Sequence, residues 1–393
     1  MGRSLLAVIA AIIVVAAAVF VAVSGGAGGR VTVTVTHTQT ELATVVETKP
    51  VTVTATLTVT ETNVETVTET LVETKTVVET QTLSVRKEFP RFLVDALGRN
   101  VTIPEPPKKL ASLSPAITEM LWALGVLNKL VAVDHSSDYP PVVVTWKKEG
   151  RVVDVGGYWW TGISLEKLVS AEPDLVIAEV GAHAKLLAAF RDYGLRVVYV
   201  RGGSAKTLED VYLDIWLVGY AVGAERNATR WIEAMKANVT LVEEKLAEAN
   251  VTSVPVLVIL WWSPQGIWVS GGDTFLADMV KRAGGYLVTS KYSGWQQLSL
   301  EQLAELRPQL ILYTGMGGDV NSTLQVLETI ASSEPVKSML EEGAKLCGLY
   351  GSATSIVLRP GPRAAMGVQL LASVIHPEVF GEPSYGVVCL GGG

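Results

Sequence analysis

The sequence has little of what most enzymes and nucleic-acid-binding proteins require. Its 393 residues include two cysteines and four histidines, and Cys347 and Cys389 have neither the number nor the spacing of a zinc site or a disulfide framework. The Gly-x-Ser-x-Gly, phosphate-loop and His-Glu-x-x-His signatures are missing. A net charge of −7 provides no basic patch that could neutralise phosphates. The sequence therefore predicts no enzyme, no resident cofactor or metal and no nucleic-acid partner.

Two features that resemble cofactor sites have simpler explanations. Gly315-Met-Gly-Gly318 follows an apolar run but lacks the rest of a dinucleotide fingerprint, so it predicts a tight turn. His135 and His183 could reach a cleft at strand ends, but a polar surface role is the better interpretation for each. One disulfide between Cys347 and Cys389 is possible if the chain is exported, and the sequence leaves that pairing open.

The N-terminal 29 residues predict a membrane anchor. Residues 5–23 form an unbroken apolar run of nineteen residues, longer than the core of most signal peptides and close to the ~20 residues that a spanning helix needs. Small residues at 24–29 keep a cleaved signal peptide as the alternative. No cysteine follows the run, so a lipid-modified N-terminal cysteine is excluded. Both interpretations place the rest of the chain outside the cytoplasm, and the anchor would hold it at the cell surface.

Residues 30–88 differ from the rest of the chain in composition. They consist largely of Val, Thr and Glu in near alternation, and residues 31–85 hold seven Glu against two Lys. Such a pattern favours an extended, low-complexity stalk, which glycans on its threonines would suit. Five Asn-x-Ser/Thr triplets also fit an exported surface; they begin at Asn100, Asn227, Asn238, Asn250 and Asn321.

From residue 89 the sequence predicts a packed α/β protein with two lobes. Short apolar strands alternate with helices over residues 89–206 and again over residues 251–385, which indicates largely parallel sheets covered on both faces. Residues 207–250 contain two helical segments and no strand. The second segment is long enough to run from one lobe to the other. The expected plan is therefore a lobe, a single long helix and another lobe.

One stretch of the chain occurs twice, at a spacing of 135 residues. Trp160-Thr-Gly-Ile-Ser-Leu-Glu166 matches Trp295-Gln-Gln-Leu-Ser-Leu-Glu301, and in each copy a proline and a buried strand follow. Ser164 and Ser299 are good N-caps, and a Glu in the first turn is favoured by the helix dipole. Each lobe is thus expected to present a Trp before a short helix and a Glu at its exposed start. Helix capping alone would explain both glutamates, whereas their repetition also suits two-point docking on a symmetric partner.

Six tryptophans lie at junctions between predicted strands and helices in both lobes. Some belong to the core, but Trp160 and Trp295 lie in polar or glycine-containing loops. Tryptophans in such loops are well placed to line a cleft and stack on a flat organic ligand. The six are Trp159, Trp160, Trp261, Trp262, Trp268 and Trp295.

Several motifs in order resemble the substrate-binding proteins of ABC importers for ferric siderophores, haem and cobalamin. The resemblance covers residues 91–382 and rests on Asp95-Ala-Leu-Gly-Arg-Asn-Val-Thr-Ile-Pro104, Leu113-Ser-Pro-Ala-Ile-Thr-Glu119, Val269-Ser-Gly-Gly-Asp-Thr-Phe275 and Arg359-Pro-Gly-Pro-Arg363, among others. It implies the class III periplasmic-binding-protein fold, with the ligand between two lobes that one long helix joins. It also implies that Glu166 and Glu301 dock on arginines of the two permease subunits, which work with ATPase subunits.

The repeated Trp motifs look most like those of the cobalamin-binding member of the family, which implies a corrinoid ligand. Two departures keep a ferric siderophore or haem as alternatives: Cys347 and Cys389 do not match that member's disulfide, and Ser136 stands where it has an aromatic residue. A structural or adhesive surface protein is a more distant alternative. The residues expected to contact the ligand are Trp160, Trp295, Trp159, Tyr158, Ser114, Trp262 and Arg359.

Overall fold

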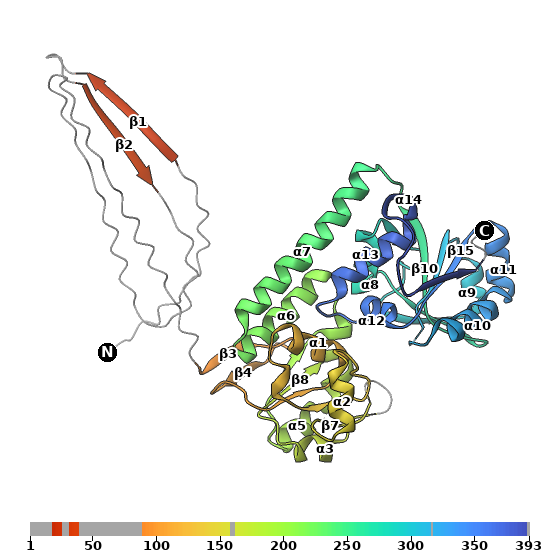
Figure 1. Cartoon of the computed structure of the whole chain (residues 1–393), viewed down its shortest axis with the longest axis horizontal. Helices are drawn as coiled ribbons and strands as arrows, with labels where there is room; N and C mark the ends of the chain where they lie inside the picture. Colours follow the sequence, from red (N-terminus) through yellow and green to blue (C-terminus); the bar gives the residue numbers. More distant parts are fainter. Residues whose placement is uncertain (1–17, 26–30, 39–88, 158–161, 316, 391–393) are drawn as a thin grey trace. The chain divides into compact units, whose positions relative to one another are not determined.

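The computed structural model describes residues 18–25, 31–38, 89–157, 162–315 and 317–390. The chain divides into two units, Met1–Ser84 and Val85–Gly393 (Figure 1). In the first unit, β1 (Ala18–Gly25) pairs antiparallel with β2 (Val31–Thr38). β2 consists almost entirely of Val and Thr, residue types that favour extended backbone.

The anchor predicted over residues 5–23 lies largely outside the described residues. Its described part, residues 18–23, belongs to β1 and is extended rather than helical, because it pairs with the Val/Thr strand β2. In the part of the chain that the structure describes, no helix is long and apolar enough to cross a membrane. The stalk predicted over residues 30–88 is described only along β2, where it is extended.

The first lobe contains a five-stranded parallel sheet in the order β7-β6-β5-β8-β9. Its central strands are apolar and buried, as the sequence predicts for a sheet covered on both faces. The strands are β5 (Leu110–Ser112), β6 (Leu130–Val133), β7 (Val153–Asp154), β8 (Leu175–Glu179) and β9 (Val197–Val200), preceded by the hairpin of β3 (Arg91–Val94) and β4 (Asn100–Ile103). The helices are α1 (Pro115–Ala123), α2 (Val142–Lys148), α3 (Leu165–Ser170), α4 (Val180–His183) and α5 (Leu187–Asp192), with short 3-10 turns at Leu127–Lys129, Ala184–Leu186 and Gly202–Ser204.

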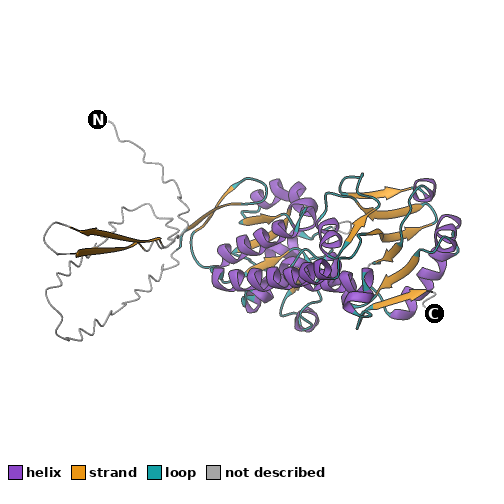
Figure 2. Cartoon of the chain, turned by 90° about the horizontal axis from the view of Figure 1, so that it is seen from above, coloured by secondary structure: helices purple, strands orange, loops and turns teal. Residues whose placement is uncertain are grey.

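Two helices connect the sheets. The predicted long helix is present as α7 (Glu225–Glu248), whose 24 residues span about 36 Å. The segment before it forms a second substantial helix, α6 (Leu208–Val222), which ends at Gly223 in the left-handed conformation and packs along α7. The connection is therefore a helix pair rather than one isolated helix. In Figure 2, helices fill the middle of the second unit, and the strands of the two sheets lie toward its ends.

The second lobe contains a seven-stranded mixed sheet in the order β13-β11-β10-β14-β15-β16, with β12 beside β10. The strands are β10 (Val254–Ser263), β11 (Gly266–Ser270), β12 (Gly285–Leu287), β13 (Trp295–Leu298), β14 (Leu310–Tyr313), β15 (Lys345–Leu349) and β16 (Val387–Leu390). The helices are α8 (Phe275–Arg282), α9 (Leu300–Ala304), α10 (Val320–Ala331), α11 (Glu334–Glu341), α12 (Ser352–Leu358), α13 (Ala364–Ile375) and α14 (Pro377–Phe380).

Strand β16 extends the second lobe beyond residue 385, where the sequence predicts its end. This antiparallel edge strand places Cys389 directly opposite Cys347 on β15, and the two form a disulfide. The bridge that the sequence leaves open is therefore present, and it ties the C-terminal strand to the sheet.

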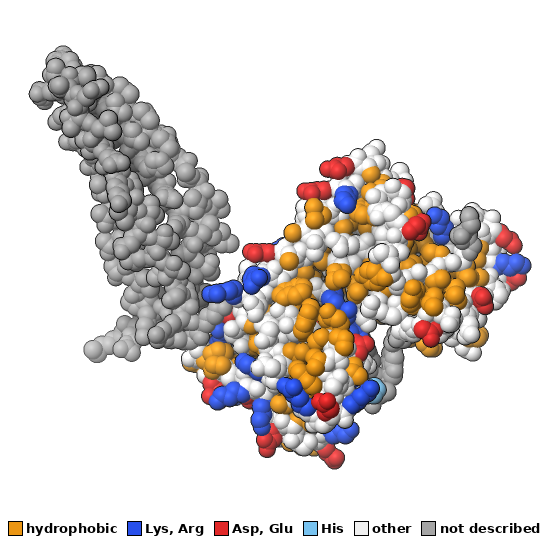
Figure 3. All heavy atoms as spheres, in the orientation of Figure 1, with side chains coloured by type: hydrophobic (Ala, Val, Ile, Leu, Met, Phe, Trp, Pro, Cys, Tyr) orange, Lys and Arg blue, Asp and Glu red, His pale blue; other side chains and the backbone are white. Residues whose placement is uncertain are grey.

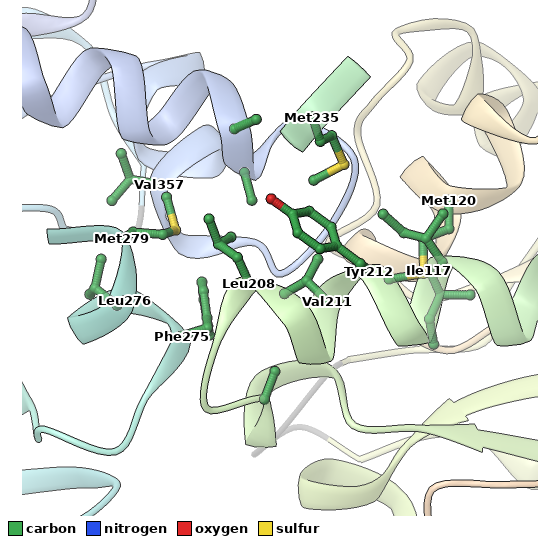
Figure 4. Close-up of a cluster of buried hydrophobic side chains, with 14 of the residues drawn as sticks. Ile117, Met120, Leu208, Val211, Tyr212, Met235, Phe275, Leu276, Met279 and Val357 are labelled. Carbon is green, nitrogen blue, oxygen red and sulfur yellow. The ribbon is translucent and has the colours of Figure 1, made fainter. Parts of the chain in front are cut away.

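A single hydrophobic cluster runs from one lobe into the other. Figure 4 shows α6 in its middle, with the α1 residues on one side and the α8 residues on the other. Because the two lobes share this buried core, separating them would expose apolar surface, so large hinge motions are disfavoured. The cluster's central members are Ile117, Met120, Leu208, Val211, Tyr212, Met235, Phe275, Leu276, Met279 and Val357.

Candidate functional site

The lobes contact each other where the parallel strands of the first lobe end. Asp138 lies in the segment after β6, and Gly203 lies in the turn that follows β9; both contact residues of the second lobe. In α/β folds, ligands bind at the carboxyl ends of parallel strands. Figure 3 shows that the surface is indented where the two lobes meet. We therefore place the candidate site at this junction.

Three tryptophans of the second lobe share one face of its sheet. Trp261 on β10 pairs with Trp268 on β11, and Ser270, two residues further on, pairs with Trp295 on β13. Alternation along the strands places all three side chains on the same side. Trp261 is 50% exposed and Trp268 42% exposed. We call this surface the tryptophan face. It offers flat apolar area that a large planar ligand could cover.

Trp295 connects the tryptophan face to the first lobe. Its indole N–H donates a 3.1 Å hydrogen bond to the carbonyl of Gly203, and its ring packs edge-on against Phe275, with ring centres 6.0 Å apart. The sequence predicts a loop at Trp295, but the residue begins β13 because it extends the sheet beside Ser270. Its partly buried position makes it a contact between the lobes as well as a candidate ligand contact.

A buried ion pair joins the lobes at another point. The Arg363 guanidinium donates to both carboxylate oxygens of Glu119, over 2.8 and 2.6 Å, and both side chains are almost fully buried. Arg363 also lies over the ring of Tyr139, 3.9 Å from its centre. A two-point contact of this kind fixes orientation as well as distance. The pair thus holds α1 against the start of α13.

Arg359, a predicted ligand contact, is part of the same ion network. Its guanidinium lies 3.0 Å from Glu119 and 2.6 Å from Asp138. Burial opposes its charge, but these carboxylates outweigh that effect and raise the pKa of Arg359. Asp138 is largely exposed. In this structure the charge of Arg359 is therefore neutralised by the protein itself.

Buried polar groups support the first lobe's side of the junction. Asp214 on α6 accepts hydrogen bonds from the backbone N–H groups of Arg201 and Gly202, over 3.0 and 2.8 Å. Glu179 accepts from the N–H of Gly203 over 2.9 Å. Gly202 has φ of 54°, and a Cβ there would lie 2.1 Å from Glu179, so only glycine fits. These carboxylates fix the turn whose carbonyl receives the Trp295 indole.

His183 does not occupy the polar surface position that the sequence favours. It is buried, and its Nδ1 accepts the backbone N–H of Glu179 over 3.0 Å. Burial, assisted by Lys185, lowers the pKa of His183 to about 4. His135 is exposed, as expected, with Nδ1 2.8 Å from Asp154.

The stability of the protein should fall between about pH 4 and pH 7 because of Asp214. Burial, only partly offset by its two backbone hydrogen bonds, raises the pKa of Asp214 to about 7, whereas an unfolded chain has an Asp pKa of about 3.9. The folded state therefore binds the proton more tightly, and this stabilisation is complete below pH ~4 and lost as the pH rises through ~7. The contribution is at most about 4 kcal/mol, at ~1.4 kcal/mol per pKa unit.

This pH dependence can be measured by urea unfolding from pH 5 to pH 8. In Asp214→Asn the free energy of unfolding should fall less steeply with pH, because the amide does not titrate. An unchanged slope in that variant would assign the decline to other groups, such as Asp134, whose pKa burial raises to about 6.

Comparison with known proteins identifies the fold family. The periplasmic binding protein family matches residues 110–339. An uncharacterized ABC transporter substrate-binding lipoprotein of Bacillus subtilis is 30% identical over 297 residues, which cover 75% of this chain and 88% of that protein. The chain belongs to the periplasmic binding protein family. The family resemblance that the sequence motifs indicate is thereby confirmed, and the chain is a substrate-binding component of an ABC transporter.

Other relatives of this periplasmic binding protein include proteins named for different ligands. A vitamin B12-binding protein of Pectobacterium atrosepticum is 30% identical over 223 residues, covering 55% of this chain and 75% of that one. The crystal structure of a periplasmic haem-binding protein from Pseudomonas aeruginosa superposes with a TM-score of 0.56 at 19% identity, covering 70% of this chain and 94% of that one. This last similarity supports the two-lobe fold alone.

The two predicted docking glutamates occupy equivalent positions in this periplasmic binding protein. Glu166 lies in the first turn of α3 and Glu301 in the first turn of α9, and both are exposed. Ser164 caps α3 and Ser299 caps α9, as the repeat predicts. The Ser299 hydroxyl lowers the pKa of Glu301. Both carboxylates are therefore held at helix starts and face solvent.

The structure does not bring the other predicted ligand contacts together in one site. Tyr158, Trp159 and Trp160 lie outside the described residues. Ser114 is fully buried, and its hydroxyl caps α1 by accepting the N–H of Ile117. Trp262 packs against the core on the opposite side of the sheet from Trp261.

A bulge explains the positions of Trp261 and Trp262. The pairing of β10 with β11 shifts between Ile259 and Trp261, and a one-residue shift exchanges the two faces of a strand. Trp261 consequently lies on the tryptophan face, whereas Trp262, the residue predicted to contact the ligand, packs against the core. The sequence indicates Trp261 and Trp268 only as two of six tryptophans at strand–helix junctions. The strand register is what identifies them as the exposed pair.

A cavity of about 780 Å³ lies at the other edge of the second lobe's sheet. It is lined by the first residues of three parallel strands, Val254, Leu310 and Lys345, together with His376. The amino edge of a parallel sheet is not where α/β proteins bind their ligands. We therefore keep the junction as the candidate site.

Proposed function

We propose that this periplasmic binding protein captures a corrinoid, such as cobalamin, between its lobes and delivers it to an ABC permease. The tryptophan face carries the proposal, because Trp261, Trp268 and Trp295 offer a flat apolar surface at the junction of the lobes. The vitamin B12-binding relative supports the same ligand class. A ferric siderophore or haem is the alternative within the family. Because the lobes share a core, we expect capture by a largely preformed site.

The ligand can be identified directly. Protein isolated from its native membrane should carry a corrinoid that mass spectrometry detects, and the emptied protein should bind cobalamin with quenching of tryptophan fluorescence. Binding of haem or a ferric siderophore in place of cobalamin would select the alternative ligand. Failure to bind any of the three would argue against a chelate receptor.

Trp268→Ala should weaken ligand binding by roughly 1–3 kcal/mol, the scale for uncovering a large aromatic contact. Trp268 is exposed, so its loss should leave the unfolding temperature nearly unchanged. Trp295→Ala should weaken binding too, but it should also lower the unfolding temperature because it removes the bond to Gly203. Isothermal titration with cobalamin and a thermal melt would measure both effects. Unchanged affinity in both variants would remove the tryptophan face from the site.

We also propose that residues 5–23 hold the protein at the outer face of the membrane, since their apolar run is long enough to span it. This requires residues 18–23 to leave β1 and become helical in the bilayer. The mature protein should then keep its N-terminus and stay in the membrane fraction through carbonate extraction. A mature N-terminus that begins near residues 25–30 would instead indicate a cleaved signal peptide.

A further inference from the structure

The β3–β4 hairpin at the start of the second unit has two faces of different character. On its inner face, Leu93, Val101 and Ile103 are buried in the main hydrophobic cluster. On its outer face, Phe92 is 70% exposed and Val94 61% exposed. Figure 3 shows hydrophobic side chains at the surface where Figure 1 places this hairpin. A two-stranded sheet with an uncovered apolar face is a site of unwanted association.

A glycosylation triplet lies on the same outer face. Asn100 and Thr102 of β4 are both exposed, and the strand register sets Asn100 opposite Val94 and Thr102 opposite Phe92. Side chains that oppose each other across antiparallel strands have Cβ atoms ~5 Å apart, and diagonal neighbours are ~7–8 Å apart. A sugar on Asn100 would therefore reach over both apolar side chains.

We propose that Asn100 carries an N-linked glycan that covers Phe92 and Val94. The donor is a sugar linked to a lipid phosphate in the exporting membrane. Asn100 Nδ2 forms a bond to the anomeric carbon, the bond from that carbon to the phosphate oxygen breaks, and Nδ2 releases one proton. The lipid phosphate leaves, and no oxidant or reductant takes part. The apolar face of the sugar ring then covers the hydrophobic surface while its hydroxyls face water.

The same triplet at Asn227 provides an internal contrast. Asn227 Nδ2 donates a 2.8 Å hydrogen bond to the carbonyl of Leu124, and a Cβ on Gly125 would lie 3.2 Å from it. A glycosylated Nδ2 keeps one N–H for that bond, but its sugar would have to fit beside Leu124 and Gly125, which this contact already brings close. Of these two triplets, the fold therefore favours a glycan at Asn100.

The experiment uses full-length protein isolated from its native membrane and digested for mass spectrometry. The peptide that contains Asn100 should carry a sugar mass, and the peptide that contains Asn227 should not. The added sugar mass should be absent from this peptide in Asn100→Gln and in Thr102→Ala. It should remain in Thr102→Ser, which keeps the triplet. All three changes lie on an exposed face, so the variants should fold.

A second measurement tests the covering role. Binding of a hydrophobic dye should increase severalfold in Asn100→Gln, and adding Phe92→Ser to that variant should reverse the increase. An unmodified Asn100 in the native protein would overturn the proposal. Equal dye binding by the parent and Asn100→Gln would overturn the covering role.

Discussion

The double substitution Glu166→Gln with Glu301→Gln should abolish stimulation of the transporter's ATPase and leave ligand affinity unchanged. Both carboxylates are exposed in the first turn of a capped helix, one on each lobe. If they meet permease arginines, each forms a charge-assisted pair that glutamine cannot replace. Losing one partner of such a pair leaves the other unpaired at the interface and should weaken docking by roughly 30-fold or more. ATPase assays in proteoliposomes that contain the permease would measure this.

Glu172→Gln provides a matched control for this experiment. Glu172 also lies on the first lobe, two residues beyond the end of α3, and it is exposed and paired with Lys109. Its loss removes one negative charge from the same lobe without touching the repeated position. Full stimulation by the Glu172 variant and none by the double variant would identify the two glutamates as the docking contacts. Normal stimulation by the double variant would assign them to helix capping alone.

Glu119→Gln should lower the free energy of unfolding by about 3–5 kcal/mol, the scale for breaking a buried ion pair by removing one partner. The change leaves the buried Arg363 guanidinium without its two-point partner and also removes one of the two carboxylates beside Arg359. Urea unfolding monitored by tryptophan fluorescence would give the size of the loss. We also expect weaker ligand binding, since the pair sets how the lobes meet.

Glu119→Met combined with Arg363→Met separates the two causes of this loss. Replacing both partners by apolar residues of similar size removes the unpaired charge and should recover much of the stability. A single variant as stable as the parent would show that the pair contributes little across the junction. A double variant no more stable than the single one would assign the loss to the shape of the contact rather than to charge.

Local patterns made much of the fold predictable. The helix caps at Ser164 and Ser299, the strand of residues 310–313 and the long helix α7 depend on short-range sequence signals, and each forms where the sequence places it. The antiparallel strands β11, β13 and β16 were not predicted. They are only four or five residues long, too short for a clear pattern in the sequence, and each forms by antiparallel pairing with a neighbouring strand of the sheet.

The site was less predictable than the fold because it depends on register and on distant pairs. The bulge in β10 decides which of Trp261 and Trp262 faces the junction, and no local sequence pattern predicts that bulge. Arg363 and Glu119 lie far apart in the sequence, so their contact arises from the way the lobes pack. The sequence at Gly202 and Gly203 does not predict that the buried carboxylates of Asp214 and Glu179 accept hydrogen bonds from this turn.

The hydrophobic cluster that runs through α1, α6 and α8 also constrains how such a receptor could acquire a new ligand. Because helices of both lobes interlock in it, neither lobe can be exchanged for a homologous one without rebuilding that contact. Variation is tolerated more readily in the strand ends and hairpins around the junction, which lie outside the shared core. We therefore expect ligand preference to change through substitutions at those positions, while the helices between the lobes stay the same.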